Sequence, residues 1–513
     1  GSGGLDLAGD TFTSGGKIRN FGRNIVGDAN QKADITVNGV TADKNLDIDS
    51  GAGTLTVGGA VNVAAGHALT LGSQNAIEGA GVITSDALVL DAAAATVNLT
   101  GTQAITKLDG KAKGLTLKNG ANLTVGGETG LTTAADGADI DVTGDLKVGA
   151  HGITNGAGAM NLKASGALSL DANAEVKSTG AAATSLEAAA VNFVTGSKVS
   201  TVGGTINLKT DALTLPAGAQ GTLSSANGKV TVETKTANKT MSVGSSSAAD
   251  LDLPNLDFID SGTGTVQIGN DQAGDIEIGA TPVKAPLSVT SHDTIKVTGA
   301  VTNTNNKDIA FTGSTVNFDA GSSLAAGSGK TKIVADAVNL ENGTFSGTGV
   351  FAVQKKTAGN FDVGGASTFL SDASIGKLAA GDFYNVAVGS KDNAGTATIG
   401  TISALPKYTS ILTNGALSVM GTVHGTDSDT LALHGDGLTQ TAPIEVGNLL
   451  LLGKGSMNLG TQSNKIGNIA ADMVTGDLKL KNRTNMKVAV VEDRTVTPAN
   501  NVDGLKTKTT DIK

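Results

Sequence analysis

The stretch TLTVGGAVNVAAGHALTLG, residues 54–72, contains the pattern that decides the fold. Two aliphatic residues flank one polar residue three times in it, and Gly58-Gly59 and Gly66 separate the three triplets. Alternation with period two places both aliphatic side chains on one face of a strand and the polar side chain on the other. Each triplet therefore predicts a short, half-buried β-strand, and the glycines predict corners that tolerate positive φ.

The same unit recurs from one end of the chain to the other, and helical periodicity is missing. Gly-Gly, Asn-Gly and Asp-Gly pairs bound many of the units. Outside 54–72 the units include Leu88-Val89-Leu90, Val97-Asn98-Leu99, Leu115-Thr116-Leu117, Leu123-Thr124-Val125, Ile140-Asp141-Val142, Leu168-Ser169-Leu170, Ile206-Asn207-Leu208, Leu213-Thr214-Leu215, Val230-Thr231-Val232, Ile276-Glu277-Ile278, Val316-Asn317-Phe318, Val338-Asn339-Leu340, Leu417-Ser418-Val419 and Leu478-Lys479-Leu480.

Strands this short need neighbours, because two buried aliphatic residues give only about 3 to 6 kcal/mol before the ordering entropy is subtracted. An antiparallel sandwich or barrel could supply them, and so could a solenoid of stacked coils. A sandwich array needs longer strands, hairpins and linkers between modules, whereas here the pattern runs without a break. The sequence therefore favours an all-β fold: a right-handed, single-stranded parallel β-helix of about 25 coils, continuous over residues 1–513 as an elongated rod.

Composition restricts the core and the partners. The chain has 72 Gly, 3% aromatic residues and no Trp, so Val, Leu, Ile and Ala must fill the core. Its net charge is −10, and neither nucleic acid nor anionic lipid is expected as a partner. The absence of Cys fits a long protein that is exported unfolded. No apolar run approaches the roughly 20 residues of a membrane span, and Gly1–Gly4 lacks the features of a secretion signal.

Residues 435–490 carry the most specific pattern in the chain. This segment reads Gly-Asp-Gly-Leu-Thr-Gln-Thr at 435–441, then Asn464-Lys465-Ile466-Gly467, Ile469-Ala470-Ala471 and Gly476-Asp477-Leu478-Lys479-Leu480. The order resembles the haemagglutinin repeat region of filamentous-haemagglutinin-like exoproteins, the secreted partners of two-partner secretion systems, and of high-molecular-weight adhesins. In those proteins the phrases G-x-G-x-x-Q-T, N-x-x-G-x-L-A-A and L-x-L-x-N recur together.

The resemblance implies a β-helical shaft that is exported through an outer-membrane transporter partner to the bacterial cell surface or the medium. It also implies adhesion, through receptors or glycans on host or bacterial surfaces. Residues 1–60 show no convincing secretion domain, so we expect a fragment of a larger protein or a divergent member. Two alternatives to an adhesin stay open: a structural subunit that self-associates into an extracellular filament or surface layer, and a β-helical polysaccharide lyase or hydrolase.

No catalytic, cofactor or metal site is expected, and the chain is not expected to be an enzyme. Polysaccharide-degrading sites gather carboxylates with basic residues, and sugar binding commonly adds aromatic platforms. Here arginines are few, and the acidic residues at outward strand positions are scattered along the chain. Examples of these acidic residues are Asp141, Asp252, Glu277 and Asp362.

Three further patterns have a structural and a functional interpretation, and we favour the structural one for each. Residues 324–331 end in Gly-Lys-Thr but begin with Leu324, and strand-like residues follow, which indicates a coil corner rather than a phosphate-binding loop. Two histidines lie among three aspartates, which indicates a solvated acidic loop rather than a metal site. Five aromatic residues indicate an internal stack rather than a receptor-binding protrusion. The residues of the last two groups are His424, His434, Asp427, Asp429 and Asp436, and Phe361, Phe369, Phe383, Tyr384 and Tyr408.

Overall fold

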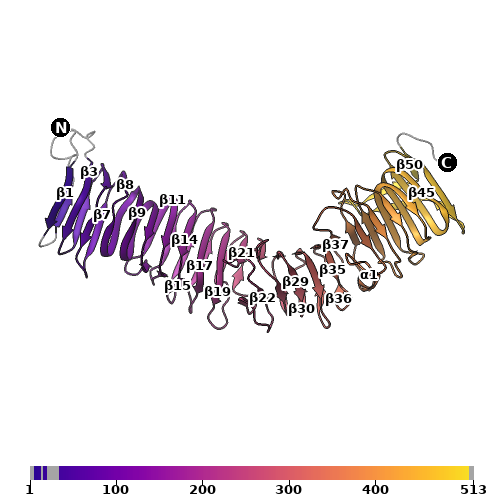
Figure 1. The fold of residues 1–513 in the computed structure, drawn as a ribbon, viewed down its shortest axis with the longest axis horizontal. Helices are drawn as coiled ribbons and strands as arrows, with labels where there is room; N and C mark the ends of the chain where they lie inside the picture. Colours follow the sequence, from indigo (N-terminus) through magenta and orange to yellow (C-terminus); the bar gives the residue numbers. More distant parts are fainter. Residues whose placement is uncertain (1–4, 13–15, 20–33, 508–513) are drawn as a thin grey trace. The chain divides into compact units, whose positions relative to one another are not determined.

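The protein is an all-β solenoid of about 21 turns, seen in a computed structural model that describes residues 5–12, 16–19 and 34–507. Gly1–Gly4 and the sequence expectation attached to them lie outside the described residues. The chain divides into two compact units, one made mainly of Gly1–Thr236 and the other mainly of Ile268–Lys513. Within each unit the strands of successive coils lie side by side in parallel (Figure 1).

In the first unit, each coil contributes strands to three parallel ladders. The first ladder contains β3 (Ile35–Ala42), β5 (Thr54–Val57), β8 (Ala76–Gly79), β9 (Ile83–Asn119), β11 (Leu131–Val142), β14 (Met160–Ala164), β17 (Thr184–Asn192), β19 (Ile206–Thr214) and β21 (Val230–Glu233). The second contains β4 (Leu46–Asp49), β7 (Ala68–Gly72), β9, β10 (Leu123–Val125), β12 (Leu146–Val148) and β15 (Ala167–Leu170). The third contains β11, β13 (Ile153–Asn155), β16 (Glu175–Ser178), β18 (Lys198–Thr201) and β20 (Leu223–Ser225).

The registers stack aliphatic side chains directly on one another inside the coils. Ile140 pairs with Leu162, Leu162 with Leu186 and Leu186 with Leu208, and all four are buried. The residues between them, such as Lys163 and Glu187, stay on the outward face. The predicted period-two strands and their parallel stacking are therefore confirmed.

One predicted unit departs from this pattern. Leu213 and Leu215 are only partly buried, and β19 ends at Thr214, before Pro216. The next strand of this ladder, β21, pairs only with Ile206–Lys209 of β19, so among the described residues no strand pairs with Leu213 on that side. A rung without a neighbour on one side stays partly in contact with solvent.

The second unit repeats the arrangement of three ladders. Its longest ladder contains β28 (Leu287–Thr290), β31 (Ile309–Thr312), β34 (Thr331–Val334), β37 (Val350–Gln354), β39 (Asn385–Gly389), β41 (Tyr408–Leu412), β44 (Thr430–Gln440) and β45 (Ile444–Met473). A second ladder contains β22 (Met241–Val243), β26 (Ile276–Ile278), β29 (Thr294–Val297), β32 (Thr315–Phe318) and β35 (Ala337–Asn339). A third contains β27 (Thr281–Val283), β30 (Ala300–Asn303), β33 (Ser323–Ala325) and β36 (Thr344–Ser346).

The number of turns is smaller than expected because most coils are longer than 20 residues, as the pairing of Leu123 with Leu146 and of Ile206 with Val230 shows, and because the chain makes excursions from the coils. Between β37 and β39 the chain forms β38 (Phe361–Val363), which pairs in parallel with β40 (Ala397–Ile399) and so belongs to a ladder. The helix α1 (Asp372–Ala379) follows, and the sequence did not predict it. The Ser371 side chain caps α1 by accepting a hydrogen bond from the Ser374 N–H at 3.2 Å. With eight residues, α1 is too short to produce a clear helical period in the sequence. Among the described residues, no helix is long and apolar enough to cross a membrane.

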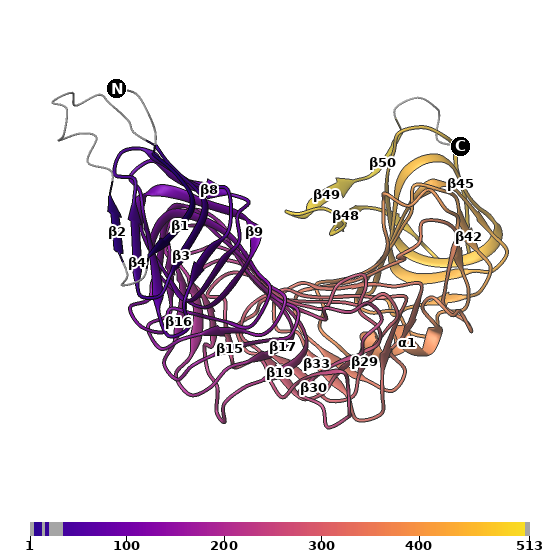
Figure 2. The same ribbon diagram turned by 60° about the vertical axis from the view of Figure 1, so that its left-hand side comes forward.

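A second excursion forms an antiparallel hairpin, which the parallel pattern also did not predict. The hairpin consists of β48 (Val490–Asp493) and β49 (Asn500–Asp503), and it is a two-stranded sheet of its own. Figure 2 shows the hairpin outside the closed coil to which β45 belongs. It therefore packs against the solenoid from outside instead of forming part of a coil.

We predict that Leu186→Ala destabilises the first unit by about 2–5 kcal/mol, because it removes buried methyl groups and leaves a cavity between two rungs. In a stacked fold the effect is local, so hydrogen exchange should accelerate most in the coils containing β14, β17 and β19. The outward neighbour Glu187→Ala is the matched control and should change exchange little. Equal effects of the two substitutions would contradict the stacked inner rungs.

Candidate functional site

The segment 435–490, which carries the family resemblance, is built around buried amides at one corner of the coil. Gln440 of β44 and Asn464 of β45 exchange side-chain hydrogen bonds at 2.9 and 3.0 Å. Asn464 Oδ1 also accepts from the Ile444 N–H at 2.8 Å, and its Nδ2 donates to backbone carbonyls on either side. Asn482, at the end of β46 (Leu478–Asn482), accepts from the Ile466 N–H at 2.9 Å. These amides close successive coils by satisfying backbone groups where the chain turns.

The first unit closes its coils in the same way. Gln103 Oε1 accepts from the Ile83 N–H at 2.7 Å, and Asn119 Oδ1 accepts from the Ile105 N–H at 3.0 Å. Both amides are buried. The Gln and Asn of the quoted phrases thus have a structural role in coil closure, and the family assignment stays a prediction.

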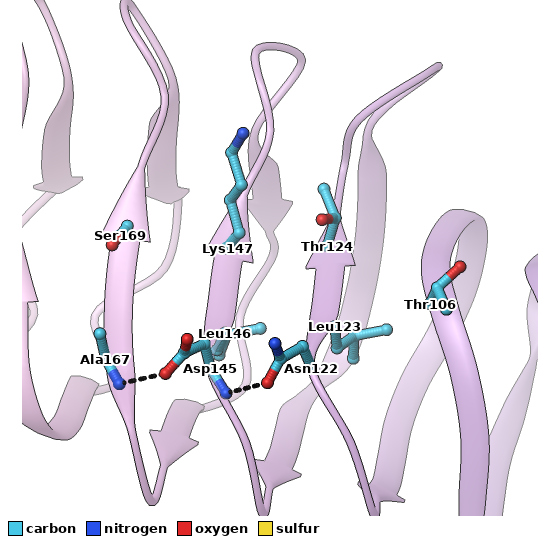
Figure 3. Close-up of a pocket in the computed structure, with 9 residues that line it drawn as sticks. All are labelled: Thr106, Asn122, Leu123, Thr124, Asp145, Leu146, Lys147, Ala167 and Ser169. Carbon is cyan, nitrogen blue, oxygen red and sulfur yellow. Dashed lines mark hydrogen bonds between the residues drawn. The ribbon is translucent and has the colours of Figure 1, made fainter.

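A shallow groove lies over outward-facing strands of the first unit. It has a volume of about 400 Å³, and β10, β12 and β15 form its floor. Thr124, Lys147 and Ser169 are register partners in successive coils, so their side chains form one row across the groove (Figure 3). The groove therefore offers hydroxyl and ammonium groups at the spacing of stacked strands, about 4.8 Å.

A second row of polar groups borders the groove and is held in place by the coils themselves. Asn122 Oδ1 accepts a hydrogen bond from the Asp145 N–H at 2.9 Å, and Asp145 Oδ1 accepts one from the Ala167 N–H at 2.8 Å (Figure 3). Lys147 Nζ forms an ion pair with Asp171 at 3.0 Å, and both side chains are largely exposed. Such groups can hydrogen-bond a polar ligand, and none of them is paired as a nucleophile and its base.

A second hollow, of about 460 Å³, lies in the other unit between coil corners and the end of α1. Its walls are small residues such as Gly327, Ser346 and Gly381. Asp382, on its rim, forms an exposed ion pair with Lys407 at 2.5 Å, and this partner holds the pKa of Asp382 below its ordinary value. The hollow presents backbone groups and one neutralised carboxylate, with little chemistry beyond hydrogen bonding.

The four outward acidic residues singled out in the sequence lie on four different strands. Asp141 lies on β11, Asp252 on β23 (Leu251–Leu253), Glu277 on β26 and Asp362 on β38. Burial alone would raise the pKa of Glu277, but hydrogen bonds with Ser245, Ser247 and Thr298 outweigh it and hold the pKa below its ordinary value. Hydroxyl groups therefore stabilise this carboxylate in its ionised form. That the chain is not an enzyme stays a prediction.

The structure disperses the histidine and aspartate residues of the acidic segment. His424 Nδ1 lies 3.3 Å from Glu445 Oε2, whereas His434 Nδ1 lies 3.1 Å from the Thr413 carbonyl. The three aspartates have separate partners, and no group of three or more His, Asp or Glu side chains able to hold a metal occurs in 34–507. Those partners are Lys465 for Asp427, Thr426 for Asp429 and Lys454 for Asp436.

The Gly-Lys-Thr sequence at 329–331 is a corner between two parallel strands. β33 ends at Ala325 and β34 begins at Thr331, with no helix between or directly after them. The corner's N–H groups already have acceptors in the preceding coil: Ser328 donates to Asn306 at 3.0 Å, and Lys330 donates to Asp308 at 2.8 Å. The interpretation as a coil corner is confirmed.

The aromatic residues divide into two sets. Phe361 packs edge-on against Phe369 at 5.4 Å, and Phe383 against Phe351 at 5.1 Å, and all four are buried. A run that the sequence did not single out, Phe311, Phe318, Phe345 and Phe351, continues this stack. The internal stack is therefore confirmed for the phenylalanines. It is wrong for Tyr384 and Tyr408, which lie outside the coil beside Arg494, because their hydroxyl and carbonyl groups bind the C-terminal excursion.

We predict that Asn464→Ala destabilises the second unit by about 3 kcal/mol or more, because several buried backbone groups lose their partner at once. The exposed neighbour Ser463→Ala should change the unfolding midpoint little. Denaturant unfolding with matched m-values would measure both. A small effect of Asn464→Ala would contradict the role of the corner amides.

We also predict a loss of stability on mild acidification that depends on His434. Burial lowers the pKa of His434 below its ordinary value, and Lys391 adds to this, while the Thr413 carbonyl and Asp493 oppose it. Below about pH 6.5 the histidine of the unfolded chain binds a proton that the folded chain does not yet bind, so the free energy of unfolding decreases as the pH is lowered. His434→Gln should reduce the difference in unfolding midpoint between pH 7.5 and 5.5, measured against the unmodified protein. An unchanged difference in His434→Gln would contradict this assignment.

Comparison of the chain with protein-family models, with curated proteins and with solved structures gave no match.

Proposed function

We propose that this protein is a bacterial adhesin, or the shaft of one, that acts outside the cell by binding surface glycans or receptors. The observation that carries the proposal is the row formed by Thr124, Lys147 and Ser169 across the groove. A chain of sugar hydroxyl groups laid along the stacking direction would meet one polar side chain per coil. Binding of this kind is a sum of weak contacts, and attachment needs no chemical step.

The way the exterior charges are used supports a passive role. In the first unit, Lys107 pairs with Glu128 at 2.9 Å, Lys113 with Asp136 at 3.1 Å and Lys147 with Asp171 at 3.0 Å. Each pair joins neighbouring coils, and all six side chains are well exposed, so each pair contributes little stability by itself. These partners keep the outer surface polar and locally neutral, which suits reversible attachment to an uncharged or weakly charged surface.

Export through an outer-membrane transporter partner, and a location on the cell surface, belong to the same proposal. They are supported by the absence of Cys and by the resemblance of 435–490 to exported haemagglutinin-like proteins.

We predict that Lys147→Ala combined with Thr124→Ala lowers retention on a glycan array or on fixed cells by about tenfold, since two adjacent polar contacts are lost. Lys163→Ala is the matched control, because Lys163 is an exposed lysine on β14 of the same unit and does not line the groove. Each variant is compared with the unmodified protein over a range of salt concentrations.

Equal retention of the double variant and the unmodified protein would move binding away from this groove. Absence of binding to every glycan, cell and matrix surface would leave only a shaft role. Shortening of an offered polysaccharide would instead favour the lyase or hydrolase alternative.

A further inference from the structure

On the longest ladder of the second unit, which runs from β28 to β45, the outward side chains change from polar to apolar towards the C-terminal end. On β28 and β34 the outward positions include the polar residues Ser288, Thr290 and Lys332. On the later strands, outward positions carry apolar side chains that are buried although they lie outside the coil. We call this set the outer apolar strip: Tyr408 of β41, Ala432 of β44, and Leu450, Leu452 and Ala470 of β45.

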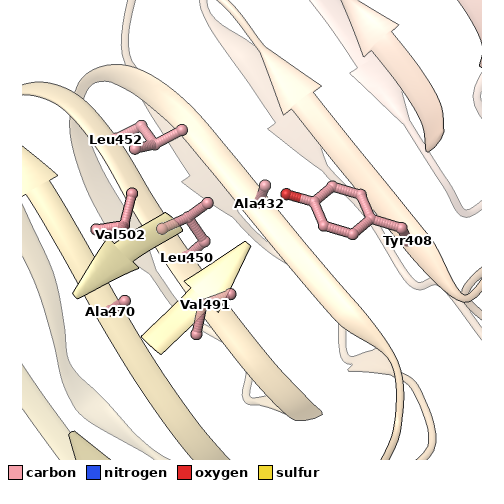
Figure 4. Packing of buried hydrophobic residues seen from close by; sticks show 7 residues of the cluster. All are labelled: Tyr408, Ala432, Leu450, Leu452, Ala470, Val491 and Val502. Atoms are coloured by element: carbon pink, nitrogen blue, oxygen red, sulfur yellow. The ribbon is translucent and has the colours of Figure 1, made fainter. Parts of the chain in front are cut away.

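The hairpin β48–β49 covers the outer apolar strip. Val491 and Val502 are cross-strand partners, only 4% and 6% exposed, and both face the strip (Figure 4). Val490, on the opposite face of β48, is 53% exposed. A two-stranded hairpin is marginally stable in water by itself, so its order depends on the strip beneath it. The strip in turn would expose a run of large apolar side chains without the hairpin.

Polar contacts fix the hairpin at its far end. The Tyr408 hydroxyl donates to the Glu492 carbonyl at 2.8 Å and accepts from the Arg494 N–H at 3.0 Å. The Arg494 guanidinium lies 4.4 Å from the Tyr384 ring and 5.1 Å from the Tyr408 ring, and it donates to the Tyr384 carbonyl at 2.9 Å. Burial raises the pKa of Tyr408, so its hydroxyl keeps the proton that it donates. The hairpin is a separate two-stranded sheet, so it adds no strand to the coil's ladder.

The hairpin leaves and re-enters the last coil at one place. β47 (Lys487–Val488) and β50 (Leu505–Thr507), which flank it, both pair with β45. At the base, the Gly504 N–H donates to the Ala489 carbonyl at 3.4 Å, and Gly504 has a φ of +76°. The Ala489 N–H also donates to the Ile469 carbonyl at 3.1 Å, and the Gly504 carbonyl accepts from the Ala471 N–H at 2.9 Å. Lifting the hairpin while keeping these two bonds to β45 therefore requires rotation on their hairpin side, at the ψ of Ala489 and the φ of Gly504, and it breaks the 3.4 Å bond between the two residues.

We propose that the β48–β49 hairpin exchanges between two copies of the protein, so that the hairpin of each copy covers the outer apolar strip of the other. The surface that fits the strip is the hairpin's own, with Val491, Val502 and Arg494 matched to it, and a second copy carries the same surface. Every contact of the closed form recurs in the exchanged form, and only the hinge at Ala489 and Gly504 changes. The strip is thus a surface for self-association that each isolated copy covers with its own hairpin.

The test uses two full-length copies with different affinity tags, mixed, warmed to open the hairpin, cooled, and recovered through one tag. We expect the second copy to be recovered with the first, in an amount that rises with protein concentration. Val491→Asp in both copies should lower the recovered partner by about tenfold or more, because a carboxylate would have to be buried against leucines without a partner. Val490→Asp, its neighbour on the exposed face, is the matched control and should leave recovery unchanged.

Hydrogen exchange of residues 287–412 establishes whether the solenoid of each variant is intact. A partner that is never recovered from the unmodified mixture would overturn the proposal. Recovery that Val491→Asp leaves unchanged, or that Val490→Asp abolishes, would also overturn it, since association would then use another surface.

Discussion

Stacking of each coil on the next through parallel backbone hydrogen bonds is the constraint on which the rest of the structure depends. A strand of three or four residues points only about two side chains into the coil, so it gains its stability from the strands above and below. This requirement also explains the corners, where successive coils approach closely. At Gly137, with a φ of +87°, a Cβ atom would lie 2.1 Å from the Ala159 carbonyl oxygen of the next coil. The corner sequences are therefore rich in glycine because backbone packs on backbone there.

Polar side chains, like the backbone ladders, form hydrogen bonds between one coil and another. Asp109 Oδ1 accepts from the N–H groups of Glu128, Thr129 and Gly130 in the following coil, and the Lys356 ammonium reaches the Ser291 and His292 carbonyls of an earlier one. Many exterior groups are therefore engaged in joining coils. The groove over β10, β12 and β15 is a shallow surface with regularly spaced polar groups, and the proposed adhesion relies on such groups.

The second unit departs from this pattern of outward polar side chains on β41, β44 and β45, where outward side chains are apolar. Leucines at 450 and 452 stand outside the coil, and the chain covers them with a hairpin that belongs to no ladder. A similar relation holds at α1, which contacts β36 and whose Ile375 and Leu378 are buried. Each excursion thus accompanies apolar surface that the coil itself does not enclose, and such surface is where association between molecules becomes possible.

The sequence by itself determined the all-β class, the short strands and their parallel stacking, because alternation with period two and glycine-rich corners are local properties of the chain. The coil corner at 329–331 was also predictable, since a strand-like pair follows the Gly-Lys-Thr. Only the tertiary structure decided that Gln440, Asn464 and Asn482 close coils and that Thr124, Lys147 and Ser169 form a row. It also decided that Tyr408 is buried under the hairpin outside the coil, whereas Phe361 is buried in the phenylalanine stack. These facts depend on the register between coils, and the lengths of the intervening loops, which vary along the chain, set that register. The hairpin and α1 escaped prediction for the same reason: both are short excursions whose stability comes from the surface on which they pack and not from their own sequence.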